Sequence, residues 1–164
     1  MKYLAAVLAL PVLALAAQTD PDTHFYKAAA AGGIGEVEMG RIAEQKSSDP
    51  KVKEFAAMMI KDHSAANEEL KSLAASKSVS LPDGPGAHAD AAKAKLQLLS
   101  GASFDKYYLS NQIAAHKSTV ALLNKEISSG QDDEAKAFAR KILPTVRSHL
   151  KAADQLAESL GIKH

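Results

Sequence analysis

The chain has 164 residues, which is room for one domain, and its 20 Lys and Arg residues nearly balance 19 Asp and Glu residues. This balance argues against nucleic acid as a partner, because such binding depends on clustered Lys and Arg. The lack of cysteine excludes disulfides, thiolate zinc sites, iron–sulfur clusters, c-type haem attachment and thiol nucleophiles. The 32 alanines outnumber the 18 Val, Ile and Thr residues together, so an all-α protein is expected.

Residues 1–17 have the pattern of a signal peptide. Lys2 precedes an apolar run that ends in small residues, and cleavage is expected after Ala16 or Ala17. The run, at 15 residues, is shorter than the roughly 20 apolar residues of a transmembrane helix. We therefore expect no transmembrane anchor after cleavage, and a mature protein that is periplasmic or secreted, with 19 cationic and 19 anionic side chains once Lys2 is removed.

Two long helices are predicted next, over residues 23–46 and 51–76, each with an apolar stripe at helical spacing. Between them, Asp49 can accept hydrogen bonds from first-turn amides and Pro50 fits the first helical position, so the two helices form a tight hairpin. One ionisable residue interrupts each stripe. It is Glu36 in the first helix and His63 in the second.

Residues 77–103 form a long connection, because its Pro-Asp-Gly-Pro-Gly run at 82–86 forbids a helix there while residues 88–99 can form a short one. Two further long helices follow, over residues 104–128 and 134–160, and their stripes contain His116 and His149. Two helical hairpins joined by a long crossover with a short helix are typical of a ferritin-like four-helix bundle. We predict that this one domain covers residues 22–160.

Several short segments resemble an exported bacterial family called domain of unknown function 4142. They are the run Ala30 to Gly40, Lys53 to Ala56, Asp62-His63, Phe104 to Tyr107, His116, and Leu143-Pro144 with His149. Some members of that family are labelled as outer membrane proteins. The resemblance spans nearly all of the mature chain, from about Asp22 to Leu156, and it implies a ferritin-like fold and export. It implies no catalytic role, because the family has no settled activity.

Glu36, His63, His116 and His149 form a candidate metal site. Counting residues from the helical turns places the first three near one level along the helix axes, while His149 is offset from His116 by about 7.5 Å, a distance that a kink at Pro144 could alter. Imidazole and carboxylate ligands suit a divalent ion of zinc, copper or iron. Copper could also use the thioether of Met39 or Met59.

The residues three positions before the histidines are Ile60, Ile113 and Val146, where di-iron proteins of the ferritin-like class have a Glu. Ferroxidase chemistry of that kind is therefore not expected. A buried polar layer, in which hydrogen-bonded histidines fix the register of the helices, is the interpretation that the sequence favours over a metal site. A b-type haem between two histidines is a further alternative, but it needs a slot lined by large apolar side chains, and these stripes are rich in alanine.

Other polar residues are interpreted as solvent-exposed. Asp62 points about 100° away from His63 around its helix, so we expect it to be solvated. His24, His88 and His164 are expected at the surface. We interpret the glycines at 32, 33, 35 and 40, which lie within a predicted helix, as sites of close approach by another helix or of a bend.

These observations predict an exported helical-bundle protein that has a candidate metal site in its core and acts in envelope or stress physiology. The alternative is a non-metal structural or interaction module whose partner is another envelope protein. We expect no enzymatic activity, because no pairing of a nucleophile with a base is recognisable in the sequence. Nothing in the sequence indicates the oligomeric state.

Overall fold

The computed structural model describes residues 20–163, and in that part of the chain it contains five α-helices and no strand. The expectation of an all-α protein is therefore confirmed. The helices are α1 (Pro21–Lys46), α2 (Pro50–Ser76), α3 (Gly86–Leu98), α4 (Gly101–Ser129) and α5 (Asp133–Ser159). The predicted signal peptide, residues 1–17, lies outside the described residues.

The two tight turns between long helices are capped in the same way. The side chain of Asp49 accepts hydrogen bonds from the amides of Lys51 and Val52, at 2.8 and 3.3 Å. Asp132 repeats this at the start of α5, accepting from the amides of Glu134 and Ala135 at 2.9 and 3.3 Å. Each carboxylate satisfies first-turn amides that have no partner within their helix. The chain therefore reverses sharply at both points and forms two helical hairpins, α1 with α2 and α4 with α5.

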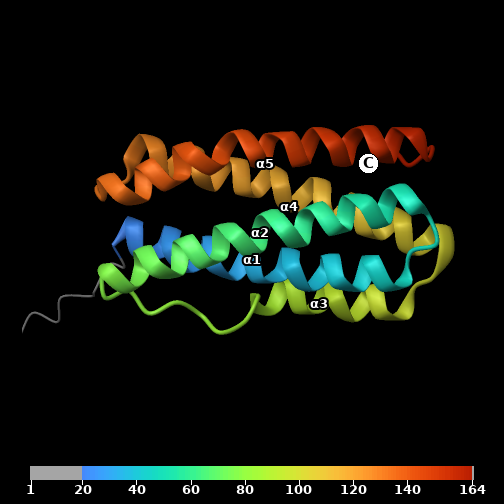
Figure 1. Ribbon diagram of the computed structural model, residues 1–164, viewed down its shortest axis with the longest axis horizontal. Coiled ribbons are helices and arrows are strands. Elements are labelled where there is room, and N and C mark those ends of the chain that lie inside the picture. The colour runs from blue at the N-terminus through green and yellow to red at the C-terminus, as the bar shows by residue number, and fades with distance from the viewer. Residues whose placement is uncertain (1–19, 164) are drawn as a thin grey trace, which may run out of the picture.

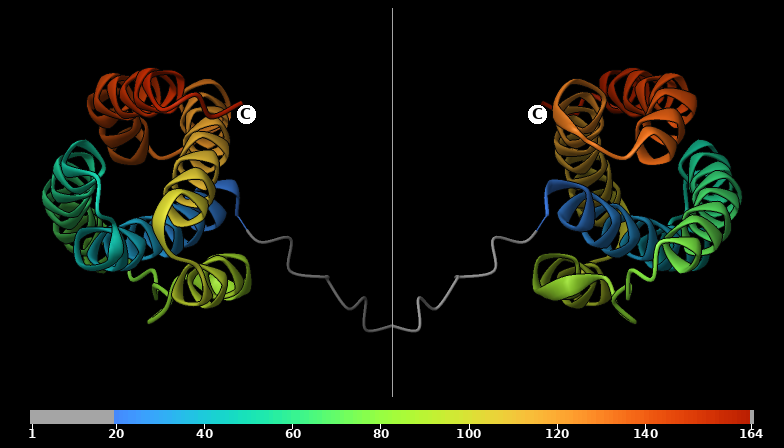
Figure 2. Two further views of the ribbon diagram at one scale, coloured as in Figure 1. Left: turned by 90° about the vertical axis from the view of Figure 1, so that its right-hand side faces the viewer. Right: turned by 90° about the vertical axis from the view of Figure 1, so that its left-hand side faces the viewer.

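The four long helices lie side by side, and Figure 1 shows that α2 and α4 run in the same direction. They can do so because residues 77–100, which include α3, return the chain along the whole length of α1. α1 packs against α2 and α4, and α5 packs against the same two helices. α3 lies outside this group, against α1 and α4 (Figure 2). Each long helix thus has one face toward a shared interior.

Apolar side chains fill this interior in two separate clusters. One lies toward the α1–α2 turn and includes Met59, Phe104, Tyr108 and Ile113. The other lies toward the opposite end and includes Phe25, Leu70, Leu123, Phe138 and Val146. Along α2, α4 and α5, each of the three stripe histidines falls between residues of the first cluster and residues of the second. The histidines therefore form a polar layer between two halves of the core.

The glycines of α1 separate into two kinds. A Cβ atom at Gly40 would lie 2.9 Å from Cγ1 of Ile60 and 3.2 Å from the carbonyl oxygen of Ala56, so α2 approaches closely there, as predicted. A Cβ atom at Gly32 would have no neighbour within 4 Å, so of the two reasons predicted for a glycine, close approach does not apply at that position. Gly32 instead borders open space.

None of the helices within residues 20–163 combines the length and the apolar character needed to cross a membrane.

Candidate metal centre

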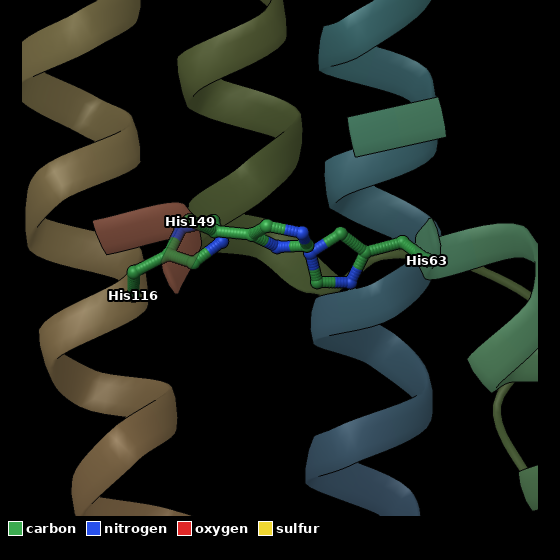
Figure 3. A group of neighbouring side chains, drawn as sticks. All are labelled: His63, His116 and His149. Atoms are coloured by element: carbon green, nitrogen blue, oxygen red, sulfur yellow. The ribbon is translucent and has the colours of Figure 1, made fainter. Parts of the chain in front are cut away.

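Three histidines from three helices converge in the interior. His63 comes from α2, His116 from α4 and His149 from α5, and Figure 3 shows their rings turned toward one another. The ring centroids are 5.4 to 5.6 Å apart in all three pairs. One ligand atom from each ring lies within 4.8 Å of the other two. This is the only group of three or more histidines and carboxylates within residues 20–163 that is arranged to hold a metal ion.

Hydrogen bonds fix which nitrogen of two of these rings carries the proton. Nδ1 of His116 donates to the carbonyl oxygen of Gln112 at 2.9 Å, and Nε2 of His149 donates to Oδ2 of Asp62 at 2.9 Å. A carbonyl and a carboxylate can only accept, so the second nitrogen of each ring carries a lone pair. Those atoms, Nε2 of His116 and Nδ1 of His149, are buried and have no hydrogen-bond partner within the described chain. Nε2 of His63 is buried and unpartnered in the same way.

The surroundings of His63 and His149 favour the neutral form of these imidazoles. Burial, with the nearby His116 and His149 rings, lowers the pKa of His63 from 6.5 to about 3. Burial also lowers the pKa of His149, although the hydrogen bond to Asp62 opposes that effect. Neutral imidazole is the form that binds a metal ion. At neutral pH, no proton therefore has to leave His63 or His149 before a ligand bond forms.

Glu36 is buried in α1, but it approaches the Nδ1 nitrogen of His116 and not the unpartnered Nε2 nitrogen. Its Oε1 is 3.9 Å from Nδ1 of that ring, the nitrogen that already donates to a carbonyl, and its Oε2 accepts a 2.6 Å hydrogen bond from Nε2 of Gln112. Burial raises the pKa of Glu36, while His116 and Gln112 act in the opposite direction. The structure thus brings together three of the four predicted site residues, and it places Glu36 behind one of them.

His149 lies level with the other two histidines, which differs from the offset of about 7.5 Å expected from counting residues along straight axes. Pro144 lies inside α5, five residues before His149. Proline removes a hydrogen bond from the helix and allows its axis to bend. The first turns of α5 are inclined to the rest of the helix in Figure 1. Counting residues along a straight helix axis therefore gives the wrong height for His149 along the bundle.

The sequence interpretation of Asp62 as a solvated residue is wrong. The 100° rotation that turns it away from His63 on α2 turns it toward α5, where it accepts the hydrogen bond from His149. The side chain of His149 is 3% exposed and that of Asp62 is 33% exposed, so the histidine end of this hydrogen bond is buried and the carboxylate is partly exposed. Gln112 was also missed, because a backbone carbonyl as the partner of a histidine leaves no signal in residue type. His24 and His88 are exposed, as predicted, and His164 lies outside the described residues.

A buried polar layer without an ion would pair its own nitrogen and oxygen atoms, since more than 90% of buried polar groups in proteins have a partner. Here His116 and His149 pair outward, to a carbonyl and a carboxylate, and each of the three rings leaves one buried nitrogen unpaired. Metal-binding histidines show the same pattern, in which the second ring nitrogen donates to a carbonyl or a carboxylate. The geometry thus fits a metal ion better than it fits a hydrogen-bonded layer.

Solved structures with this fold share little sequence with the chain. A protein described as a secreted member of DUF305, from Streptomyces coelicolor, superimposes with a TM-score of 0.76 at 18% identity, covering 88% of this chain and 96% of its own. A DUF305 fragment from Deinococcus radiodurans gives 0.73 at 17% identity, covering 87% and 97%. CopM in its Cu(I)-bound form gives 0.70 at 18% identity, covering 84% and 96%.

No curated protein matches the chain. At the level of sequence families, residues 9–156 match the domain of unknown function DUF4142. This match confirms the resemblance seen in the sequence, and it shows that the chain belongs to the DUF4142 family.

Proposed function

We propose that the protein binds one transition-metal ion, preferentially Cu(I), through Nε2 of His63, Nε2 of His116 and Nδ1 of His149. The observation that carries this proposal is the convergence of three buried ring nitrogens that have no hydrogen-bond partner within the described chain. Leaving a buried polar atom without a partner costs about 1 to 3 kcal/mol, so three such atoms facing one another represent a considerable cost without a ligand. One ion in contact with all three would satisfy them together.

The separation of the ligand atoms is compatible with one ion. Histidine nitrogens bind zinc at about 2.0 to 2.1 Å, so ligands on opposite sides of an ion are about 4 Å apart and those at smaller angles are closer. One ring nitrogen from each of the three histidines lies within 4.8 Å of the other two. A contraction of about 1 Å, within reach of small ring rotations, would bring them to bonding distance.

Copper is placed first among the candidate ions because of a solved structure with a similar fold. Imidazole is a good ligand for copper, zinc and iron alike, so the ligand type alone does not choose among them. The similar fold of CopM was solved with Cu(I), with Cu(II) and with silver, which favours copper. Iron is the least favoured, because the Glu three residues before each histidine of a di-iron site is replaced by Ile60, Ile113 and Val146.

Residues around the three histidines would hold them ready for the ion. The Gln112 carbonyl and Asp62 fix the proton on the outward nitrogen of His116 and His149, which directs the lone pair inward. Such hydrogen bonds also make the imidazole a stronger ligand. When bound, copper would supply redox and Lewis-acid chemistry, but we propose a binding role rather than an enzymatic one.

We also propose that the fold is a ferritin-like four-helix bundle and that the protein is exported. The packing of α1, α2, α4 and α5 around one interior, with α3 outside it, supports the first part. The pattern of residues 1–17 supports the second, as does the likeness to a Streptomyces coelicolor protein described as secreted. A copper-binding role in the cell envelope, under metal stress, follows as the physiological proposal.

The test is the metal content of the purified protein and of single variants. The protein is loaded anaerobically with Cu(I) and dialysed, and His63→Ala, His116→Ala and His149→Ala are compared with His24→Ala, which changes an exposed histidine of α1. We expect one ion per chain in the wild type and in His24→Ala, and less than one tenth of that in the other three. Equal copper in all five proteins, or in none, would reject the proposal and leave the interaction-module interpretation.

Thermal unfolding provides a second measurement. A ligand at 100 times its dissociation constant stabilises the folded state by about 2.7 kcal/mol. For a domain of this size that corresponds to a rise in Tm of roughly 5 to 10 °C. The rise is expected for the wild type and absent for His116→Ala.

A further inference from the structure

A cavity of about 370 Å³ borders the histidine cluster on one side. His63 and His149 form part of its wall, and the rest is contributed by α1, α2, α4 and α5. Most of the lining is apolar or small, and it includes Ala28, Ala29, Ala66, Leu70, Leu123 and Phe138. A cavity of about 150 Å³ lined by apolar side chains is sufficient to bind benzene. This cavity therefore has room for a ligand the size of a substituted aromatic ring.

Gly32 on α1 lies at the edge of the cavity. It lines the cavity and is also exposed to solvent, so it marks an opening. No atom lies within 4 Å of the position that its Cβ would occupy. By contrast, a Cβ atom at the neighbouring Gly33 would lie 1.9 Å from Oδ1 of Asn67. A side chain at position 32 would thus extend into open space at the opening of the cavity, and its Cβ atom would displace no neighbouring residue.

The charges around the cavity disfavour an anion. Glu36 and Asp62 lie in its wall, and both are carboxylates. The lining cation Lys141 is paired with Glu69, which also lines the cavity, at 2.8 and 2.7 Å from the two carboxylate oxygens. Moving any ion into an apolar cavity also costs the loss of its hydration. An uncharged ligand is therefore the chemical class that the cavity suits.

We infer that the three histidines leave one coordination position of the ion open toward this cavity, and that a small uncharged donor ligand binds there with its apolar part against the alanines of α1 and α2. This inference rests on the proposed function. Three protein ligands with one open position distinguish sites that exchange ligands from closed structural sites, which have four. The site would accordingly be one that takes up a further molecule.

Carbon monoxide and benzyl isocyanide are suitable probes, because both are uncharged, bind Cu(I) through carbon and have infrared bands that shift on binding. Carbon monoxide tests whether a position is open, and benzyl isocyanide tests whether the cavity holds the rest of the ligand. The proteins are the Cu(I)-loaded wild type, Gly32→Leu and Gly32→Ala. Gly32→Leu fills the opening, and Gly32→Ala is the matched control, since one methyl group leaves most of the space.

We expect both bands in the wild type and in Gly32→Ala. Gly32→Leu should keep the carbon monoxide band but bind benzyl isocyanide at least tenfold more weakly. If Gly32→Leu does not fold, Ala66→Leu adds comparable volume from α2 and carries the same expectation. A Cu(I)-loaded wild type that binds neither probe would overturn the inference and leave the proposed function intact, as would a Gly32→Leu protein with wild-type affinity for benzyl isocyanide. A wild type that takes up no Cu(I) would reject both proposals.

Discussion

Asp62 on α2 and His149 on α5 are 87 residues apart in the sequence, and they are joined by a 2.9 Å hydrogen bond from Nε2 of the histidine to the carboxylate. The bond crosses between the two helical hairpins and orients a buried imidazole. It fixes Nδ1 of His149 as the atom that faces the other two histidines. The first prediction follows from this pair.

Replacing Asp62 by alanine should weaken Cu(I) binding by about 10- to 100-fold, the usual cost of losing a residue that orients a metal ligand. The stoichiometry should remain one ion per chain, since no ligand is removed. Competition against a chromogenic Cu(I) chelator measures the affinity. Glu69→Ala is the control, because Glu69 is a carboxylate on the same helix that pairs with Lys141 at the surface. Equal affinities for Asp62→Ala and Glu69→Ala would contradict the prediction.

Glu36→Gln distinguishes the three-histidine set from the four-residue set predicted by sequence. Glu36 faces the protonated nitrogen of His116, so it should not be a ligand. We expect the variant to retain one Cu(I) per chain, with an affinity within tenfold of the wild type. Loss of copper in this variant, measured after dialysis as for the histidine variants, would show that the carboxylate does reach the ion.

The stability of the metal-free protein should fall in acid because of His63. The pKa of His63 is about 3 in the folded protein and 6.5 in the unfolded chain. Below pH 6.5 the unfolded chain therefore takes up a proton at this residue, and the folded chain does not. Each pH unit between 6.5 and about 3 therefore removes about 1.4 kcal/mol of stability through this one group. Urea unfolding at pH 7, 5.5 and 4, with a chelator present, measures the free energy of unfolding.

His63→Leu is the comparison for that experiment, because it removes the titrating group and leaves His149, whose pKa is lowered as well. The free-energy curve of the variant should be flatter with pH than that of the wild type between pH 6.5 and 4. Parallel curves would mean that His63 takes up protons equally in both states, and that its burial has no consequence for stability.

Two glycines of α1 should respond in opposite directions to alanine. Alanine is favoured over glycine within a helix by about 1 kcal/mol, and Gly32→Ala should gain up to that amount because its Cβ meets nothing. Gly40→Ala should instead lose about 1 to 2 kcal/mol, since overpacking against Ile60 and the Ala56 carbonyl outweighs the helix preference. Urea unfolding at pH 7 gives both values. A stabilised Gly40→Ala would show that α2 can move away without cost.

The helices were predictable because their boundaries depend on local chemistry. Asp49 caps the first turn of α2 in the structure, as its position before Pro50 predicted, and helix α2 begins within one residue of the predicted start. The stripe positions of the three histidines were predictable for a similar reason, since helical spacing alone decides which residues face the interior.

The partners of the histidines were not predictable, because they depend on how far each helix is rotated and bent against its neighbours. Asp62 looked solvated when only its own helix was considered, and its partner comes from α5. Glu36 shares a level and an interior face with the histidines, yet a rotation of one ring decides whether it meets a lone pair or an N–H group. Such angles are set by the packing of whole helices and leave no mark in the spacing of residues.

The three histidines are divided between the two halves of the chain: one belongs to the α1–α2 hairpin and two belong to the α4–α5 hairpin. An ion held by all three would join segments far apart in the sequence, as a disulfide does, in a chain that has no cysteine. Such a link lowers the entropy of the unfolded chain, and more so when the loop it closes is long. Bound copper would then act as a reversible cross-link between the two hairpins, and the hairpins would separate more readily once the ion is removed.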